Sequence, residues 1–281
     1  MSIITLTTDF GLKDHFVGAL KGKIYAQIPN ATLIDISHHV DPFNIAQASY
    51  MVESAYHHFP KGSIHIIGVD AERNPHNEHI AMFWNDHYFI AADNGILSIL
   101  TQKINPDKIF TITIHDRLHV DATDLDVFIA VAAHLSKGGL LNVIGREITD
   151  LKDITQIQPV VERNSVIKGS VIYIDHFGNV VSNITKKLFL EVGQNRPYEL
   201  FFTAKSNHKA VKPIKTIYSK YSDILKGADF QNQDYDGLRL AIFNEANYLE
   251  LGIFRSNPAS VGSASSLFGL RYRDPVEIIF K

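Results

Sequence analysis

The chain has 281 residues, of which 45% are hydrophobic and 20% charged, values typical of a soluble globular protein with room for two domains. A net charge of −3 provides no basic field for nucleic acid or an anionic membrane surface, so we expect neither partner. The absence of cysteine excludes disulfides and thiolate chemistry, and no apolar run approaches the roughly 20 residues of a membrane span. We expect a cytoplasmic protein.

The N-terminal stretch predicts a strand, a turn and a helix. β-prone residues run from Ile3 to Thr8, Asp9 follows, and an apolar period of 3.6 residues begins at Phe16. Ligands of open α/β sheets bind at the carboxyl ends of strands, where Asp9 would lie. Its carboxylate could accept hydrogen bonds from a vicinal diol such as that of ribose, or it could simply cap the helix or its turn.

Strands and helices alternate through the first half of the chain. Strands are predicted at 32–36, 64–70, 80–84, 88–91 and 108–114, with helices after Asn44 and from Asp124 to Leu135. This alternation favours an α/β domain with a mostly parallel central sheet, which we place at residues 1–155.

Strand patterns dominate the second half. The polar stretch 156–164 contains Pro159 and no helical period, so we interpret it as a linker. Residues 165–281 contain several predicted strands and one short predicted helix near 258–268. We therefore expect an all-β, barrel-like C-terminal domain.

Several motifs, taken in order, resemble one enzyme family. They are Thr8-Asp9-Phe10-Gly11 with Asp14 and Lys21-Gly22, Val69-Asp70, Asp93-Asn94-Gly95, and Asp175-His176-Phe177-Gly178-Asn179 with Ser182-Asn183-Ile184. Their order and spacing are similar to those of the S-adenosyl-L-methionine (SAM) hydroxide adenosyltransferases, the adenosine-forming SAM hydrolases related to fluorinase and chlorinase. The resemblance implies a small-molecule adenosyl ligand and a homotrimer with its sites at subunit interfaces.

The resemblance also assigns binding roles in the N-terminal domain. It implies that Asp9 holds the ribose hydroxyls, that Asp14 lies beside the site, and that Phe43 forms an aromatic wall under the ribose.

In the C-terminal domain, the resemblance implies that Phe177 and Asn179 meet the adenine and that Asp175 faces the amino group of the methionine part. The halogenating branch of the family has a Ser-Arg pair for the methionine carboxylate. This chain has Asn244-Glu245-Ala246 at that place, and Glu245 would repel a carboxylate.

The implied reaction is attack on C5′ of SAM with loss of methionine, a neutral thioether. The leaving group needs neither a metal nor a proton, so we expect no cofactor, and SAM itself is the substrate. In the hydrolase branch an Asp, an Arg and a His position the water. Asp70 stands at the Asp position, but Asn77 stands where the Arg is expected and Thr123 where the His is expected.

Other residues could replace the two missing groups. Arg73 lies in the same loop as the expected Arg, His76 or His79 could supply an imidazole, and Asp124 could pair with Asp70. Each also has an ordinary explanation, because loop Arg and His side chains are usually solvated and Asp124 is well placed to cap a helix. The catalytic candidates are therefore Asp70, Arg73 and Thr123.

We predict no metal site. The cluster of Asp121, Asp124 and Asp126 lacks the glycine and terminal Glu of a calcium loop, and His38-His39 has no third ligand at matching spacing. Three functions stay open: a SAM hydrolase, a catalytically impaired nucleoside- or SAM-binding protein, and an enzyme acting on a different adenosyl substrate.

Overall fold

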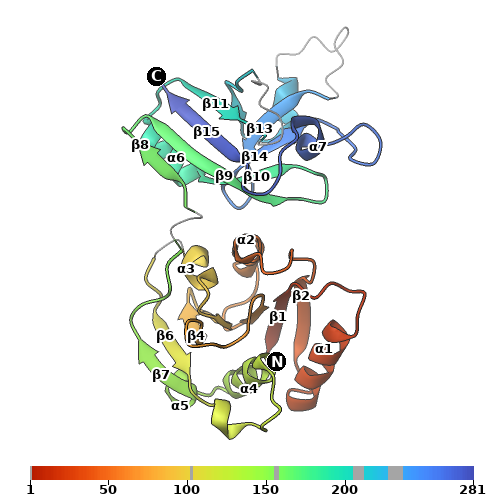
Figure 1. Cartoon of the computed structure of the whole chain (residues 1–281), viewed down its shortest axis with the longest axis vertical. Helices are drawn as coiled ribbons and strands as arrows, with labels where there is room; N and C mark the ends of the chain where they lie inside the picture. The colour runs from red at the N-terminus through yellow and green to blue at the C-terminus, as the bar shows by residue number, and fades with distance from the viewer. Residues whose placement is uncertain (1, 102–103, 155–157, 205–211, 227–236) are drawn as a thin grey trace. The chain divides into compact units, whose positions relative to one another are not determined.

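The computed structural model describes residues 2–101, 104–154, 158–204, 212–226 and 237–281. The chain divides into two compact units, Met1–Ile154 and Thr155–Lys281, called here the N-terminal and C-terminal units (Figure 1). The stretch interpreted as a linker contains a strand, β8 (Val160–Glu162), which pairs antiparallel with β9 (Val166–Ile174) of the C-terminal unit.

The N-terminal unit contains one seven-stranded sheet in the order β2-β1-β3-β5-β4-β6-β7. Its strands are β1 (Ile3–Thr8), β2 (Thr32–Ser37), β3 (Ile64–Gly68), β4 (His79–Trp84), β5 (His87–Ala92), β6 (Lys108–Ile112) and β7 (Gly145–Ile148). The neighbours among β2, β1, β3 and β5 pair in parallel, whereas the pairs β5–β4, β4–β6 and β6–β7 are antiparallel.

The sheet is therefore mixed, and the expectation of a mostly parallel sheet needs correction. The change of direction occurs at Asn85 and Asp86, whose φ angles are 49° and 64°. Two consecutive residues with positive φ form the tight turn that joins neighbouring antiparallel strands, so β4 and β5 make a hairpin instead of a parallel crossover.

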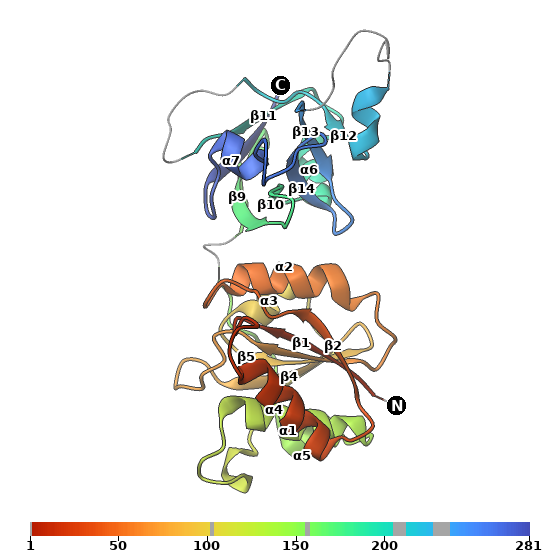
Figure 2. The ribbon, with the colours of Figure 1, turned by 90° about the vertical axis from the view of Figure 1, so that its right-hand side faces the viewer.

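Helices cover both faces of this sheet. They are α1 (Phe16–Gln27), α2 (Ile45–Tyr56), α3 (Ile96–Leu100), α4 (Asp124–Ser136) and α5 (Leu141–Ile144), with a 3₁₀ turn, η1, at His115–Arg117. Figure 2 shows α2 and α3 on one face and α1, α4 and α5 on the other. Leu6 of β1 packs in one buried cluster with Ile24 of α1 and Phe128 of α4, whereas Ile67 of β3 packs on the opposite side with Val52 of α2. The alternation of side chains along the strands produces these two cores.

The C-terminal unit is built on one curled sheet in the order β11-β15-β9-β10-β14-β13-β12, with β8 added beside β9 (Figure 1). Its remaining strands are β10 (Val180–Thr185), β11 (Tyr198–Phe202), β12 (Ile217–Tyr218), β13 (Arg239–Phe243), β14 (Tyr248–Ile253) and β15 (Pro275–Phe280). All neighbouring pairs are antiparallel except β12–β13.

This unit is not purely β. It also contains α6 (Lys186–Gly193), α7 (Ala264–Phe268) and a 3₁₀ turn, η3 (Tyr221–Leu225). The helix expected near 258–268 is α7, which Ser263 caps and Gly269 ends with a φ of 69°. Helix α6 was not predicted. Its N-cap is Thr185, whose side chain accepts a hydrogen bond from the Leu188 N–H. Thr185 is also the last residue of β10, so in the sequence it is indistinguishable from the end of a strand.

Candidate active site

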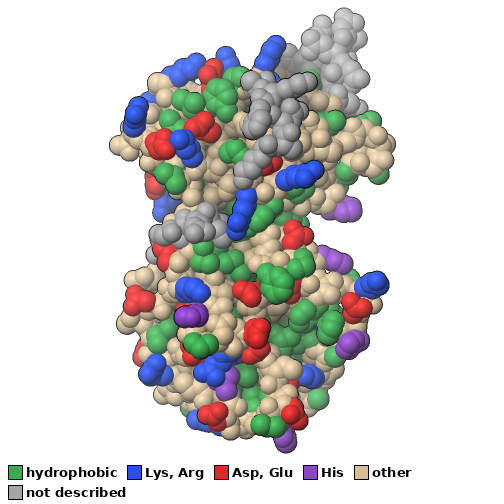
Figure 3. All heavy atoms as spheres, in the orientation of Figure 1, with side chains coloured by type: hydrophobic (Ala, Val, Ile, Leu, Met, Phe, Trp, Pro, Cys, Tyr) green, Lys and Arg blue, Asp and Glu red, His purple; other side chains and the backbone are tan. Residues whose placement is uncertain are grey.

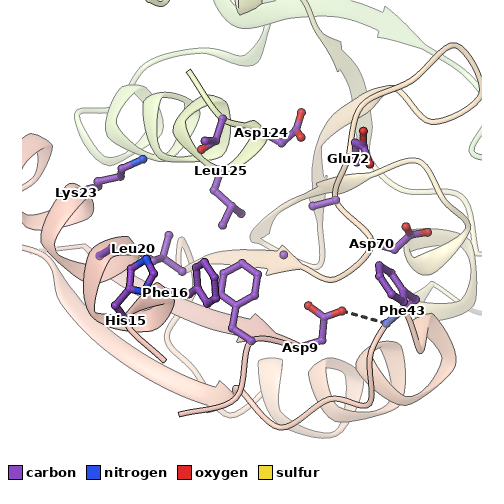
Figure 4. A pocket seen from close by; sticks show the side chains of 15 residues that line it. Asp9, His15, Phe16, Leu20, Lys23, Phe43, Asp70, Glu72, Asp124 and Leu125 are labelled. Carbon is purple, nitrogen blue, oxygen red and sulfur yellow. Dashed lines mark hydrogen bonds between the residues drawn. The ribbon is translucent and has the colours of Figure 1, made fainter. Parts of the chain in front are cut away.

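A cavity of ≈ 480 Å³ lies beside the carboxyl ends of β1 and β3 in the N-terminal unit (Figure 4). We call it the Asp9 pocket. Thr8 pairs with Gly68 in the sheet register, so the segments that follow the two strands emerge side by side. The pocket is lined by residues 9–10 after β1, 43 before α2, 68 at the end of β3, 70–72 after β3, 123–125 at the start of α4, and His15, Phe16, Ala19, Leu20 and Lys23 around α1.

Of the six site residues predicted in the N-terminal unit, the fold brings four to this pocket and leaves Asp14 and Arg73 outside it. Asp9, Phe43, Asp70 and Thr123 line the cavity, and Figure 4 shows the Asp9 and Asp70 side chains near Phe43. Asp14 is exposed just before α1 and does not line it.

The Asp9 carboxylate is held by the backbone of the segment before α2. Its Oδ2 accepts a hydrogen bond from the Phe43 N–H at 3.0 Å (Figure 4). Phe43 has a φ of 60° and is 72% exposed, so its ring is available to a ligand. The described cap position of α1 is His15, which makes no side-chain cap hydrogen bond. Asp9 therefore does not cap α1, and Oδ1 can accept from a ligand while Oδ2 is fixed.

A buried histidine supports the turn that carries Asp9. The Thr8 hydroxyl lies 2.7 Å from His38 Nδ1, and the Gly11 N–H donates to the His38 carbonyl at 2.6 Å. His38 Nε2 lies 3.1 Å from Asp35 Oδ1, so we assign the imidazole proton to Nε2. Burial acts to raise the pKa of Asp35, but hydrogen bonds from Lys21 and His38 outweigh it and lower that pKa. His38 thus has a structural role beneath the pocket.

Asp70 follows β3 in a left-handed conformation, with a φ of 47°. This conformation is uncommon for a residue with a side chain and needs support from its surroundings. The buried Asn94 provides it, because its Nδ2 donates to the carbonyls of Val69 at 3.1 Å and Asp70 at 2.9 Å. The motif Asp93-Asn94-Gly95 therefore braces the loop that directs Asp70 into the pocket.

Two residues proposed as catalytic have other partners. Arg73 forms a two-pronged ion pair with Glu78, from Nε to Oε2 at 2.8 Å and from Nη2 to Oε1 at 3.3 Å. It lines a second cavity, of ≈ 920 Å³, and is not among the residues of the Asp9 pocket. Thr123 is the N-cap of α4, and its hydroxyl donates to Asp126 Oδ2 at 2.8 Å. The helix is thus capped by Thr123, and Asp124 is its first residue.

The loop histidines differ sharply from each other. His76 is exposed, whereas His79 is fully buried at the start of β4. His79 Nε2 donates to the Ala71 carbonyl at 2.9 Å and lies 3.3 Å from Asp124 Oδ1, while its Nδ1 lies 3.1 Å from His115 Nε2. Burial lowers the pKa of His79, and the hydrogen bond to Ala71 only partly offsets this effect. Sequence reasoning did not single out His115, because no local pattern links it to His79.

The predicted adenine segment forms a tight turn in the C-terminal unit. Asp175 Oδ1 accepts from the Asn179 N–H at 2.7 Å, and Asp175 Oδ2 accepts from Asn179 Nδ2 at 2.9 Å. Gly178 has a φ of 73°, and a Cβ there would lie 2.2 Å from Ser263 Oγ, so only glycine fits. Phe177 is 65% exposed at the tip. The hydrogen bonds between Asp175 and Asn179 thus hold the turn, and the Phe177 ring is exposed at its tip.

A buried carboxyl that sequence reasoning missed lies near this turn. Glu250 on β14 accepts from the Tyr221 hydroxyl at 2.6 Å and from Asn244 Nδ2 at 3.1 Å. Burial raises the pKa of Glu250, the two hydrogen bonds only partly offset this, and the charge of Asp175 adds to the rise. The available signal was one acidic residue within an otherwise apolar strand. Glu245, by contrast, is exposed.

On the face drawn in Figure 3, the described Lys and Arg side chains are scattered and do not gather into one patch. Across the described ranges, no helix has the length and apolar character needed to cross a bilayer. In the same ranges there is no group of three or more His, Asp or Glu side chains arranged to hold a metal ion.

The fold and the pocket define an α/β protein with a cavity lined by several carboxylates at the carboxyl edge of its sheet. Residues 4–145 match the sequence profile of the SAM hydroxide adenosyltransferase N-terminal domain, and residues 169–277 match that of the C-terminal domain. The chain belongs to the SAM hydroxide adenosyltransferase family.

Individual relatives agree with this assignment. The chain is 29% identical over 287 residues to an (R)-S-adenosyl-L-methionine hydrolase from Methanocaldococcus jannaschii, covering 100% of this chain and 97% of that protein. It is 22% identical over 212 residues to a fluorinase from Actinopolyspora mzabensis, covering 65% and 71% of the two chains. The crystal structure of an uncharacterized conserved protein from Thermotoga maritima superposes with a TM-score of 0.78 at 28% identity, covering 98% of this chain and 99% of that one.

Proposed function

We propose that this protein hydrolyses SAM to adenosine and methionine. The oxygen of water or hydroxide forms a bond to C5′ as the C5′–S bond breaks, and the electron pair of that bond goes to sulfur. The positively charged sulfonium thereby becomes the neutral thioether of methionine. The observation that carries the proposal is the meeting of Asp9, Phe43 and Asp70 around one cavity, in a family whose relatives include (R)-SAM hydrolases.

The pocket offers separate groups for binding and for chemistry. Asp9 Oδ1 suits the ribose hydroxyls because Oδ2 is already held by the Phe43 N–H, and the exposed Phe43 ring suits an apolar sugar face. Asp70 lies on a different segment and would position the nucleophile at C5′. Holding a water in line with the breaking bond and excluding bulk solvent are the main requirements of this reaction.

The C-terminal turn would supply the remaining recognition. The exposed Phe177 ring suits stacking against adenine, with the Asn179 side chain beside it, and the negative charge of Asp175 suits the amino group of the methionine part. We further propose a homotrimer, which static light scattering would test. A monomer in solution would contradict that part of the proposal.

A second candidate substrate is an adenosyl sulfonium that lacks the carboxylate. The segment where the halogenating branch has a Ser-Arg pair here has Asn244, whose amide is engaged by Glu250 at 3.1 Å, followed by the exposed acidic Glu245. A decarboxylated SAM would then show a higher kcat/KM than SAM itself, measured under identical conditions. A clear preference for SAM would exclude this candidate.

The proposed function is tested by incubating the purified protein with SAM and following adenosine and methionine by chromatography beside a protein-free blank. We expect both products in equal amounts. If SAM or adenosine raises the melting temperature but no adenosine forms, the chain is a binding protein, and hydrolysis of SAM is contradicted.

A further inference from the structure

Two cavities of the N-terminal unit meet at the start of α4. The second cavity is lined by Arg73, Glu78 and His115 among others, and Asp124 lines both this cavity and the Asp9 pocket. Figure 4 shows Asp124 and Leu125 on α4, on the side of the pocket away from Asp9. Asp124 is therefore the side chain through which the surroundings of the second cavity can act on a ligand in the first.

One oxygen of Asp124 is held and the other is available. Oδ1 accepts from the Arg73 N–H at 3.3 Å and lies 3.3 Å from His79 Nε2. Among the described residues, no hydrogen bond reaches Oδ2. When one carboxylate oxygen is held by a hydrogen bond, the side chain is fixed in orientation, and the lone pairs of the other oxygen can accept a proton from a defined direction.

The tautomer of His79 follows from its surroundings. Nε2 faces the Ala71 carbonyl at 2.9 Å, an acceptor, so Nε2 carries the proton and donates it to Ala71. Asp124 Oδ1 lies 3.3 Å from the same nitrogen. Nδ1 then accepts from His115 Nε2 at 3.1 Å. The His79 ring packs edge-on against the Phe128 ring, with 4.7 Å between the ring centroids. This contact restricts the orientation of the imidazole. The imidazole is thus held in one orientation beside Asp124.

Several titratable groups lie around His79 and Asp124 on the side of the second cavity. Burial keeps His79 neutral, because it lowers the pKa, so the imidazole adds no positive charge next to the carboxylate. The nearby Arg73 guanidinium is matched by Glu78 in its two-pronged ion pair. His115, which has a pKa lowered chiefly by burial, also lines this side, together with the exposed Asp116 and His119.

We propose that Asp124 is the catalytic base that takes the proton of the attacking water, and that His79 is the positioning residue that holds it. This inference rests on the proposed hydrolysis of SAM. As the O–C5′ bond forms and the C5′–S bond breaks, the proton of the water passes to Asp124 Oδ2. In this proposal the pair replaces the Arg and the His that are expected at positions 77 and 123. Both residues found there have other partners: Asn77 Oδ1 accepts a hydrogen bond from Lys152 Nζ at 2.7 Å, and the Thr123 hydroxyl caps α4.

The test compares matched variants of the full chain. Asp124→Asn should lower kcat by about 100-fold or more, the range of a lost general base, while KM and adenosine affinity change little. His79→Leu should lower kcat by roughly 10-fold and move the acidic limb of the kcat–pH profile to higher pH, because the N–H dipole that lies 3.3 Å from the charged base is lost. His79→Gln places an amide N–H near the former Nε2 and should restore most of both effects.

Controls separate a chemical role from a structural one. Asp121→Asn and His58→Gln change exposed residues of the same types that line neither cavity, and they should leave kcat unchanged. If wild type hydrolyses SAM and Asp124→Asn does so at the same rate, the role of Asp124 is overturned and the hydrolase proposal stays intact. Equal losses in His79→Leu and His79→Gln, with the pH profile unmoved, overturn the positioning role. Absence of turnover in wild type contradicts the hydrolase proposal itself, and the Asp124 assignment falls with it.

Discussion

The two units hold their carboxylates in different ways. In the C-terminal turn, both oxygens of Asp175 are bound by Asn179, only four residues away. In the Asp9 pocket, Asp9 and Asp124 each have one oxygen bound by a backbone N–H from a distant segment, and the other oxygen remains for a ligand. Asp70 is aimed by the backbone bracing of Asn94.

This difference assigns the two units to different tasks. A carboxylate that is satisfied by its own turn makes a rigid frame, which suits recognition of a flat ring. Several carboxylates that line one cavity, each with an oxygen that can still accept a hydrogen bond, suit hydroxyl binding and proton transfer. We therefore expect the chemistry to belong to the N-terminal unit, and the following predictions test that division, beginning with the largest effect.

Asp70→Asn should nearly abolish hydrolysis while leaving binding intact. The amide keeps the size of the side chain but loses the charge that positions the nucleophile, so we expect kcat to fall by about 1,000-fold. Adenosine affinity, measured by calorimetry, should stay within about two-fold, since the proposed ribose contact is made by Asp9. Unchanged turnover would exclude Asp70 from the positioning of the nucleophile.

Asp9→Ala should remove nucleoside binding from the N-terminal unit. Loss of the charged hydrogen bonds to a diol corresponds to about 100-fold weaker adenosine binding. Asp41→Ala is the matched control, because Asp41 is exposed near Phe43 and does not line the pocket. Undiminished adenosine affinity in Asp9→Ala, by calorimetry, would disprove the ribose assignment.

Phe177→Ala should weaken adenosine binding by roughly 10-fold, the scale of one base stacked on one aromatic ring. Because the ring is 65% exposed, the melting temperature should not change. With saturating SAM, kcat should also be unaffected, since this turn contributes no group to the chemistry. His176→Ala alters the adjacent exposed residue and serves as the control. A fall in kcat at saturation would break the division of tasks between the units.

Acid should affect the stability of the two units in opposite directions. Burial lowers the pKa of His65 to about 3, so between pH 6.5 and 3 the unfolded state binds a proton that the folded N-terminal unit does not, and stability falls as pH falls. Burial raises the pKa of Glu250, so acidification relieves the cost of its buried charge and stabilises the C-terminal unit. Hydrogen exchange of peptides from each unit at pH 7 and pH 5 measures both. Equal changes in the two units would contradict this prediction.

Local features within each unit could be predicted from the sequence. The turn from Asp175 to Asn179 is held by contacts within itself, so its motif is sufficient to define its geometry. Asp9 was placed correctly at the end of β1, because a short β-prone run followed by a turn and a helical period specifies that position. Alternation of strands and helices likewise indicated the α/β unit.

The remaining features depend on contacts between distant segments. The pairing of His79 with Asp124 joins residues from β4 and α4 that no local pattern connects, and the ion pair of Arg73 with Glu78 depends on how their loop folds back. The mixed sheet followed from the Asn85-Asp86 turn, whose sequence is a weaker hairpin signal than one with glycine. Tertiary packing decided each of these.

The most direct test of the central claim is hydrolysis of SAM in oxygen-18 water, with mass spectrometry of the nucleoside product. The account predicts adenosine that carries one oxygen-18 atom at its 5′-hydroxyl, because water attacks C5′ and the C5′–S bond breaks. Unlabelled adenosine, or label in a product other than adenosine, would contradict it.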